Sequence, residues 1–244
     1  MTKPHLSVRG LHKWYGSVHA LRDLDLDIPQ GQVIGLIGDN GAGKSTFIKI
    51  LSGVHKQTEG QIFFEGKEAH IARPRDAMNL GIETIYQYTA MVPEMSIARN
   101  VFIGREKRKW GVRGFGMLDQ AAMAEEAMAA IADVGLHLRS ADGPVKDLSG
   151  GQRQGVAIAR AMHFRSRMLI LDEPTNHLSV KETNKVLEYV RQMREQGITV
   201  IFISHNLHHV HEVSDRIVAF SRGNKVADLL SEETTVPHMI DLIT

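Results

Sequence analysis

The chain has 244 residues, of which 43% are hydrophobic and 23% are charged, and its formal net charge is +1. These values are typical of a globular protein with a substantial core, and roughly 150 residues per domain would give one or two domains. The small charge provides no general attraction for nucleic acid or anionic lipid, so we expect no nucleic acid partner. The sequence contains no cysteine, which excludes disulfides and thiolate metal sites and suits a reducing cytosol.

The apolar segments are too short to cross a membrane. The runs at 168–171 and 198–203 fall far below the roughly 20 residues that a spanning helix requires, and the N-terminal MTKPHLSVRG lacks the apolar core of a signal peptide. Any association with a membrane is therefore expected to be peripheral.

The first part of the chain is predicted to be rich in strands. We expect strands in LSVRGL, in the alternating LDLDI, in QVIGLIG and in QIFFEGK, with turn signals such as PQG between them. The run at 33–37 is continuously apolar, which is typical of a strand buried on both faces of a parallel sheet.

The glycine-rich segment after this run, residues 38–46 with the sequence GDNGAGKST, is called here the phosphate loop. It matches G-x-x-x-x-G-K-[ST] between a predicted strand and the predicted helix STFIKIL, which is the context that the motif requires. Glycines let successive N–H groups face an anion, and the helix N-terminus adds partial positive charge. Lys44 is expected to reach the β- and γ-phosphates and the Ser45 hydroxyl to bind Mg²⁺; a glycine turn with an accidental lysine is the alternative. The predicted nucleotide-binding residues of the loop are Gly38, Asp39, Asn40, Gly41, Ala42, Gly43, Lys44, Ser45 and Thr46.

A helical insertion is predicted over about residues 88–160. The segment at 120–134 carries apolar residues on one stripe and is followed by Gly135. Another helix is expected to start at LSGGQ, residues 148–152, called here the LSGGQ segment, and such a helix start can bind an anion. One nucleotide does not require two such loops from one chain. The residues Ser149, Gly150, Gly151 and Gln152 are therefore predicted to serve a nucleotide held by another copy.

The last third is predicted to alternate strands and helices and to return to the first sheet. The expected order is a strand at 168–172, a helix at 180–196, a strand at 198–204, a short helix at 207–213 and a hairpin at 216–230. Ser179 and Glu182 fit a capping box for the long helix, and Gly197 is placed to end it.

Two acidic residues stand at the end of the strand at 168–172. Asp172 is expected to serve Mg²⁺, directly or through a water, while Glu173 polarises an attacking water. The alternative is a solvated acidic turn before Pro174.

In combination and in this order, the phosphate loop, LSGGQ and LILDEP resemble the ATPase subunit of an ATP-binding cassette (ABC) transporter, over about residues 15–205. The resemblance implies an α/β fold: a single P-loop NTPase domain over residues 1–244, with an antiparallel β part and the helical subdomain at about 88–160. It also implies ATP and Mg²⁺ as cofactors. The family works as head-to-tail dimers, here a homodimer or a paired cassette, in which the phosphate loop of one subunit faces LSGGQ of the other.

The resemblance also implies roles for three further residues. Tyr15 is placed to stack on adenine, with core packing as the alternative. Gln87 resembles the glutamine that touches Mg²⁺ or the attacking water and links the site to the membrane partner; an ordinary surface position is the alternative. His205 resembles the histidine that contacts the γ-phosphate and positions the water. His205 and His209 have the spacing of a metal pair, but without an accompanying glutamate base we expect solvated helix histidines.

The segment TIYQYTAMVPEMSIARNVFIGRE, together with LSVKE and SHNLHHVHEVSDRI, resembles the simple-sugar import branch of the family. This implies import of a monosaccharide such as fructose, ribose or xylose, with membrane permeases and a sugar-binding protein as partners. It also implies a cytoplasmic position, peripheral on the inner face of the membrane. Many members carry two fused cassettes, and this chain, with one, resembles the shorter members.

Two features depart from that branch. Asn176 and His177 resemble the EPTNHLD of soluble, translation-associated cassette proteins, which raises the alternative of an ATPase acting on ribosomes or nucleic acid. Arg99 takes a place usually held by an acidic residue, which bears on contacts with the permease.

The basic stretch at 105–113 is expected to be a solvated loop, with lipid headgroups or a partner as alternatives. The sequence does not identify the sugar.

Overall fold

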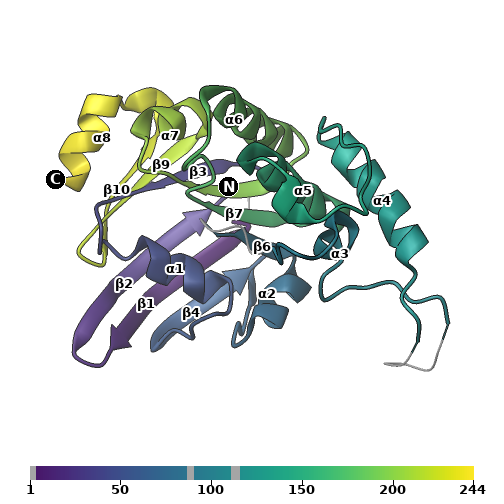
Figure 1. Ribbon diagram of the computed structural model, residues 1–244. Helices are drawn as coiled ribbons and strands as arrows, with labels where there is room; N and C mark the ends of the chain where they lie inside the picture. The colour runs from purple at the N-terminus through teal and green to yellow at the C-terminus, as the bar shows by residue number, and fades with distance from the viewer. Residues whose placement is uncertain (1–3, 87–90, 111–115) are drawn as a thin grey trace. The chain divides into compact units, whose positions relative to one another are not determined.

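The computed structural model of the protein describes residues 4–86, 91–110 and 116–244. The chain, whose helices and strands are labelled in Figure 1, divides into two compact units. The first unit comprises Met1–Gln87, Ser166–Asn176 and Val190–Thr244, and the second comprises Tyr88–Arg165 and His177–Tyr189.

The first unit contains a six-stranded sheet with the order β10-β9-β3-β8-β7-β6. Its strands are β3 (Val33–Ile37), β6 (Ile82–Ile85), β7 (Met168–Asp172), β8 (Thr199–Ile203), β9 (Arg216–Ser221) and β10 (Asn224–Leu230). Neighbouring strands from β9 to β6 are parallel, and β10 alone pairs antiparallel. All residues of β3 and β8 are buried, as expected for strands covered on both faces. Parallel strands end at a common edge, so the phosphate loop and the acidic pair, which follow β3 and β7, lie at the same edge of this sheet.

A second sheet of the first unit is antiparallel, with the order β2-β1-β4-β5. It is formed by β1 (Leu6–Tyr15), β2 (Val18–Ile28), β4 (Glu59–Phe64) and β5 (Lys67–Glu68). The sequence predicted that the early strands form one sheet and that the last third of the chain returns to it. This prediction is only partly correct. The early strands divide between two sheets, and only β3 and β6 are joined by the later strands. The alternating pattern of β2, with Leu24, Leu26 and Ile28 buried, reflects a sheet that buries one face.

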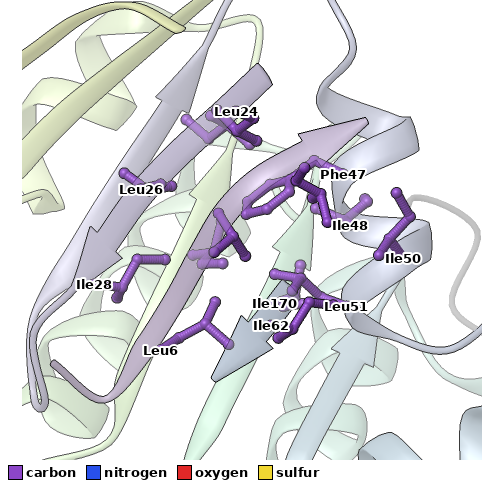
Figure 2. Close-up of a cluster of buried hydrophobic side chains, with 14 of the residues drawn as sticks. Leu6, Leu24, Leu26, Ile28, Phe47, Ile48, Ile50, Leu51, Ile62 and Ile170 are labelled. Carbon is purple, nitrogen blue, oxygen red and sulfur yellow. The ribbon is translucent and has the colours of Figure 1, made fainter. Parts of the chain in front are cut away.

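Helix α1 (Lys44–Leu51) connects the two sheets through the core of the first unit. Its buried side chains Phe47, Ile48, Ile50 and Leu51 belong to a cluster that also contains Leu6 and Ile62 of the antiparallel sheet and Ile170 of the parallel sheet (Figure 2). The other helices of this unit are α2 (Pro74–Leu80), α7 (Leu207–Val213) and α8 (Val236–Ile243). The last part of α6 (Val180–Glu195), from Val190 on, also belongs to it. Burial of this apolar surface fixes α1, and with it the phosphate loop, against the sheet.

The second unit is helical. It contains α3 (Ile97–Val101), α4 (Gln120–Asp133), a 3₁₀ turn at Val145–Asp147, α5 (Gly150–His163) and the first part of α6 (Val180–Glu195). Helix α4 buries Met123, Ala127 and Ile131, which are residues of the stripe predicted from the sequence. In the described part of the chain, none of the helices has the length and apolar character to cross a bilayer.

Candidate nucleotide site

The phosphate loop has the backbone conformation that its glycines were expected to provide. Gly38, Gly41 and Gly43 have φ angles of 147°, 81° and 105°, a region that favours glycine. A Cβ on Gly38 would lie 2.4 Å from the carbonyl oxygen of Phe220, and one on Gly43 would lie 2.8 Å from that of Ala20. The loop therefore passes too close to its neighbours for a side chain at these two positions.

Helix α1 starts directly after this loop without a protein cap. Gly43 is its N-cap residue, no side chain caps the helix, and its first turn contains no acidic residue. The first N–H groups of a helix have no partner within the helix, and they carry partial positive charge. This helix start is therefore suited to bind an anion.

Lys44 lies with its ammonium group inside the loop. Its Nζ donates to the carbonyl oxygens of Gly38 and, at 3.1 Å, of Asp39. Burial lowers the pKa of Lys44, and the carboxylates of Glu173, Asp39 and Asp172 act in the opposite direction. A cation held this close to the helix start adds to the positive potential offered to a phosphate.

The two predicted acidic residues lie at the end of β7, in register with β8. Asp172 pairs with Ile203, and the N–H of Glu173 donates to the carbonyl oxygen of Ile203 at 2.9 Å. Glu173 has a positive φ of 53°, a conformation that non-glycine residues rarely adopt and that is over-represented at functional sites. Its side chain is only 8% exposed. The alternative of a solvated acidic turn is therefore wrong for Glu173.

Burial raises the pKa of both carboxyl groups. For Asp172 the charges of Lys44 and Lys49 oppose this rise, and for Glu173 a hydrogen bond from the backbone of His205 opposes it. A carboxylate whose pKa is raised toward neutrality is a better general base. Oxygen donors such as the Asp172 carboxylate and the Ser45 hydroxyl, which line one pocket, are also the ligands that Mg²⁺ prefers.

His205 contacts Glu173 in two ways. Its backbone N–H donates to Oε2 of Glu173 at 3.1 Å, and its Nε2 lies 3.4 Å from Oε1. Its ring is 62% exposed and can reach a bound ligand. His209 instead lies 3.1 Å from the Asn206 amide and 3.4 Å from the Thr175 hydroxyl, and burial lowers its pKa. Among the residues described, no three histidine or acidic side chains form a metal cluster.

One pocket of about 630 Å³ in the first unit brings most of the predicted residues together. The predicted residues that line it are Tyr15, Asp39, Asn40, Gly41, Ala42, Gly43, Lys44, Ser45, Thr46, Asp172, Glu173 and His205. Gly38 is not among the lining residues. Tyr15 is 39% exposed, so the alternative of core packing is wrong for this ring. Its ring meets His55 edge-on at 5.4 Å between centroids, and Lys13 Nζ lies 5.0 Å from the ring centre.

The pocket also contains residues that sequence reasoning missed. His19 and Arg22 of β2 and Arg222 of the β9–β10 turn line it. The N–H of Arg22 donates to the carbonyl oxygen of Gly223 at 2.8 Å, which holds β2 against that turn. No local motif marks these residues, because they reach the pocket through pairings between distant segments. Gln87 lies outside the described residues, and its predicted role stays a prediction.

The LSGGQ segment belongs to the second unit and has its own local structure. Ser149 caps α5, and Gln152 completes a capping box: Ser149 Oγ accepts from Gln152 N at 3.3 Å and Gln152 Oε1 accepts from Ser149 N at 2.9 Å. The N–H of Gly151 donates to Oε1 of Glu182 at 3.1 Å. A separate pocket of about 220 Å³ is lined by Ser149, Gly151 and Gln152 together with residues of α6.

Comparison with known proteins identifies this arrangement. Residues 21–176 match the family described as ABC transporter. The chain belongs to the ABC transporter family. It is therefore an ATP-binding protein and an ABC-type ATPase, and the predicted family, fold class and enzyme class are confirmed.

Several proteins resemble the chain over nearly its whole length. A fructose import ATP-binding protein of Rhizobium meliloti is 44% identical and covers 99% of this chain and 94% of its own. A xylose/arabinose import ATP-binding protein of Sulfolobus acidocaldarius is 42% identical, covering 98% and 93%. A ribose import ATP-binding protein of Escherichia coli is 35% identical over 98% of this chain but only 46% of its own, so this chain spans about half of that relative.

Among solved structures, the nucleotide-free crystal structure of an ATP-binding cassette from an ABC transporter has a TM-score of 0.84. It is 25% identical and covers 98% of this chain and 94% of its own.

Proposed function

We propose that this chain hydrolyses ATP to energise a membrane importer of simple sugars. The pocket that gathers the phosphate loop, Asp172, Glu173 and His205 is the observation that carries the ATPase part. The import part is supported by relatives of 44% and 42% identity that are named for import of fructose and of xylose or arabinose. The ribosome-associated alternative is not favoured, because these relatives match nearly end to end.

In this proposal the first unit holds the nucleotide. The N–H groups of the loop and of the α1 N-terminus bind the phosphates, and Lys44 exchanges its bonds to the carbonyls of Gly38 and Asp39 for the β- and γ-phosphates. Tyr15, exposed at the pocket, offers its ring to the adenine.

Ser45 and Asp172 would hold Mg²⁺, with Gln87 as a further predicted ligand. The ion would neutralise charge that develops on the phosphates. The observation that fits this assignment is chemical: a hydroxyl and a partly buried carboxylate line the same pocket as the phosphate loop.

Glu173 and His205 carry the proposed hydrolytic step. Glu173 accepts a proton from the attacking water, and its raised pKa makes it a more effective base at neutral pH. Its contact with His205 keeps the carboxylate oriented, while the exposed imidazole contacts the γ-phosphate and positions the water. Stabilising charge on the γ-phosphate is where such sites gain most of their rate.

We further propose that two copies pair head to tail, so that Ser149, Gly150, Gly151 and Gln152 of one copy close over the nucleotide of the other. Permease subunits and, through them, a sugar-binding protein would be the partners, and the chain would lie on the inner face of the membrane. We also propose that residues 1–244 form a single ATPase domain, with a helical subdomain at about residues 88–160.

Uptake measurements test the import function. Cells with and without this chain would be given labelled fructose, xylose, arabinose and ribose, with Glu173→Gln as the inactive control. The proposal expects uptake of at least one sugar to depend on the chain and to be lost in Glu173→Gln. Unchanged uptake of every sugar, together with co-sedimentation of the chain with ribosomes at moderate salt, would favour the alternative function.

A further inference from the structure

The carboxylate of Glu182 occupies the start of helix α5 in the second unit. Its Oε1 accepts a hydrogen bond from the N–H of Gly151 at 3.1 Å, while its Oε2 accepts from the N–H and Oγ of Ser179 at 3.1 and 2.9 Å. Hydrogen bonds from Ser149, Ser179 and Gly151 lower the pKa of Glu182 to about 2. The side chain is therefore an anion at neutral pH, and it is held at the LSGGQ segment.

Capping of α6 explains only half of this arrangement. The capping box between Ser179 and Glu182 uses Oε2, and it leaves Oε1 free to turn toward another donor. That donor is Gly151, whose missing side chain makes the approach possible. A Cβ on Gly151 would lie 2.7 Å from Cγ and 2.8 Å from Cβ of Glu182. The second glycine of the segment is thus packed against this one side chain.

Oε1 of Glu182 accepts from the Gly151 N–H, a donor that a nucleotide would also need. In the proposed dimer, the Ser149 hydroxyl and the Gly151 N–H receive the phosphate of a nucleotide held by the other copy. A carboxylate and a phosphate repel each other at contact distance, and one N–H cannot serve both.

We propose that Glu182 is a positioning residue whose carboxylate binds the LSGGQ segment at Gly151 while the copy is unpaired. The carboxylate must withdraw from Gly151 before the nucleotide of a second copy can bind there. This inference rests on the proposed function. Lys181 and Lys185 line the same pocket of about 220 Å³. Lys185 lies three residues after Glu182, a spacing at which a helix brings side chains together. It offers the withdrawn carboxylate a new partner of opposite charge.

The test measures ATP-dependent pairing in a background that does not hydrolyse ATP. The parent protein is Glu173→Gln, and the test protein carries Glu182→Gln in addition. Glutamine keeps the shape of the side chain but removes the charge, and its single carbonyl oxygen can accept from Ser179 or from Gly151 but not from both. Because a hydrogen bond to an ionised group is stronger than a neutral one by about 1.4 kcal/mol, the ATP concentration for half-maximal pairing should fall about tenfold. Sedimentation velocity at a fixed protein concentration reports the fraction of dimer.

Two controls separate this effect from a structural one. Glu188→Gln removes a charge from an exposed position on the same helix and should leave the ATP dependence of pairing unchanged. Binding of a fluorescent ATP analogue to dilute, unpaired protein should be the same with and without Glu182→Gln, since Glu182 does not belong to the unit that contains the phosphate loop. A purely structural role predicts a lower melting temperature and unchanged or weaker pairing.

The outcomes are distinguishable. If the parent pairs and Glu182→Gln pairs at the same or a higher ATP concentration, the inference about Glu182 is wrong and the proposed function stands. If the parent binds ATP but never pairs, the proposed head-to-tail mechanism is wrong, and the inference about Glu182 is overturned with it.

Discussion

The phosphate loop and the LSGGQ segment are both glycine-rich turns that start a helix, but the backbone N–H groups at the two helix starts differ in their hydrogen-bond partners. At α1, no side chain caps the helix, the first turn has no acidic residue, and a lysine lies within the loop. At α5, Ser149 and Gln152 form a capping box, and the ionised Glu182 accepts from Gly151. One helix start is left open for an anion, while the other already holds an anion from its own chain. In the proposed dimer, this difference would make nucleotide bind first at the phosphate loop and only then contact the LSGGQ segment of the other copy.

The largest expected effect separates hydrolysis from binding. Glu173→Gln keeps the shape of the side chain but removes the base, so steady-state ATP turnover should fall by roughly 10²- to 10⁴-fold, the usual contribution of general base catalysis. ATP binding should remain, because the phosphate loop is untouched. Turnover is measured by phosphate release, with Glu232→Gln as the control, because Glu232 is exposed and does not line the pocket. Undiminished turnover would remove Glu173 from the catalytic role.

Binding at the open helix start should depend on Lys44. Lys44→Ala removes a charge-assisted contact with the phosphates, which is worth about 1.5 to 3 kcal/mol, so ATP affinity should fall roughly 10- to 150-fold. Equilibrium binding of a fluorescent ATP analogue measures this change. Lys67→Ala, at an exposed position of β5, is the matched loss of a lysine and should bind normally. Equal affinity in both variants would contradict the assignment of the loop.

Two glycines of the loop should respond unequally to the same substitution. Both Gly38→Ala and Gly41→Ala force a side chain into a positive φ, which costs about 1 kcal/mol or more. Gly38→Ala also brings a Cβ to 2.4 Å from the Phe220 carbonyl oxygen, whereas nothing lies within 4 Å of a Cβ on Gly41. We expect Gly38→Ala to lower the free energy of unfolding by about 2 kcal/mol more than Gly41→Ala, by the strain of displacing backbone.

Urea unfolding of both variants measures that difference. Equal losses of stability would mean that the chain relaxes around Gly38. The close approach to β9 would then not be what requires glycine at this position.

The smallest expected effect concerns the amino ends of the strands in the six-stranded sheet, whereas the phosphate loop follows the carboxyl end of β3. His5 is buried and its Nδ1 lies 2.6 Å from the hydroxyl of Thr199, the first residue of β8. Burial, and secondarily the charge of Arg167, lower the pKa of His5 from 6.5 to about 4. His5 binds a proton more readily in the unfolded chain than in the folded one. The free energy of unfolding that neutral His5 contributes is therefore complete above pH 6.5 and is lost as the pH falls toward 4.

Between pH 7 and pH 5.5 the free energy of unfolding should therefore decrease by about 1 kcal/mol from this one group. Urea titrations at the two pH values measure it, and His5→Gln should reduce the decrease. His137→Gln, at an exposed position, provides the control. ATP affinity should not differ between the two histidine variants. An identical pH dependence of stability in wild type and His5→Gln would contradict the assignment.

The sequence was most informative where chemistry and local geometry coincide. The continuous apolar run of β3, the glycines of the phosphate loop and the acidic pair after β7 are contiguous, so their motifs predicted elements that the structure contains. The division of the early strands between two sheets was not predictable, because the residues of one strand do not specify which distant strand it pairs with. His19, Arg22 and Arg222 reach the pocket through the same kind of pairing.

Glu182 shows another limit. Its spacing from Ser179 predicted the capping box, and the structure contains it. The second carboxylate oxygen bonds to Gly151, which lies 31 residues away in the chain. No pattern of residue types predicts the contact between Glu182 and Gly151, because it depends on how α5 and α6 pack together.

The central claim is that the nucleotide bound by the phosphate loop of one copy is closed over by the LSGGQ segment of another. Since the chain has no cysteine, two singly substituted proteins, Asn40→Cys and Gln152→Cys, each in the Glu173→Gln background, can be mixed and treated with a short bis-maleimide cross-linker. The account predicts a mixed dimer on a denaturing gel when ATP is present, and none when Lys44→Ala is added to both proteins. Absence of the mixed dimer at saturating ATP, with both proteins shown to bind it, would contradict the account.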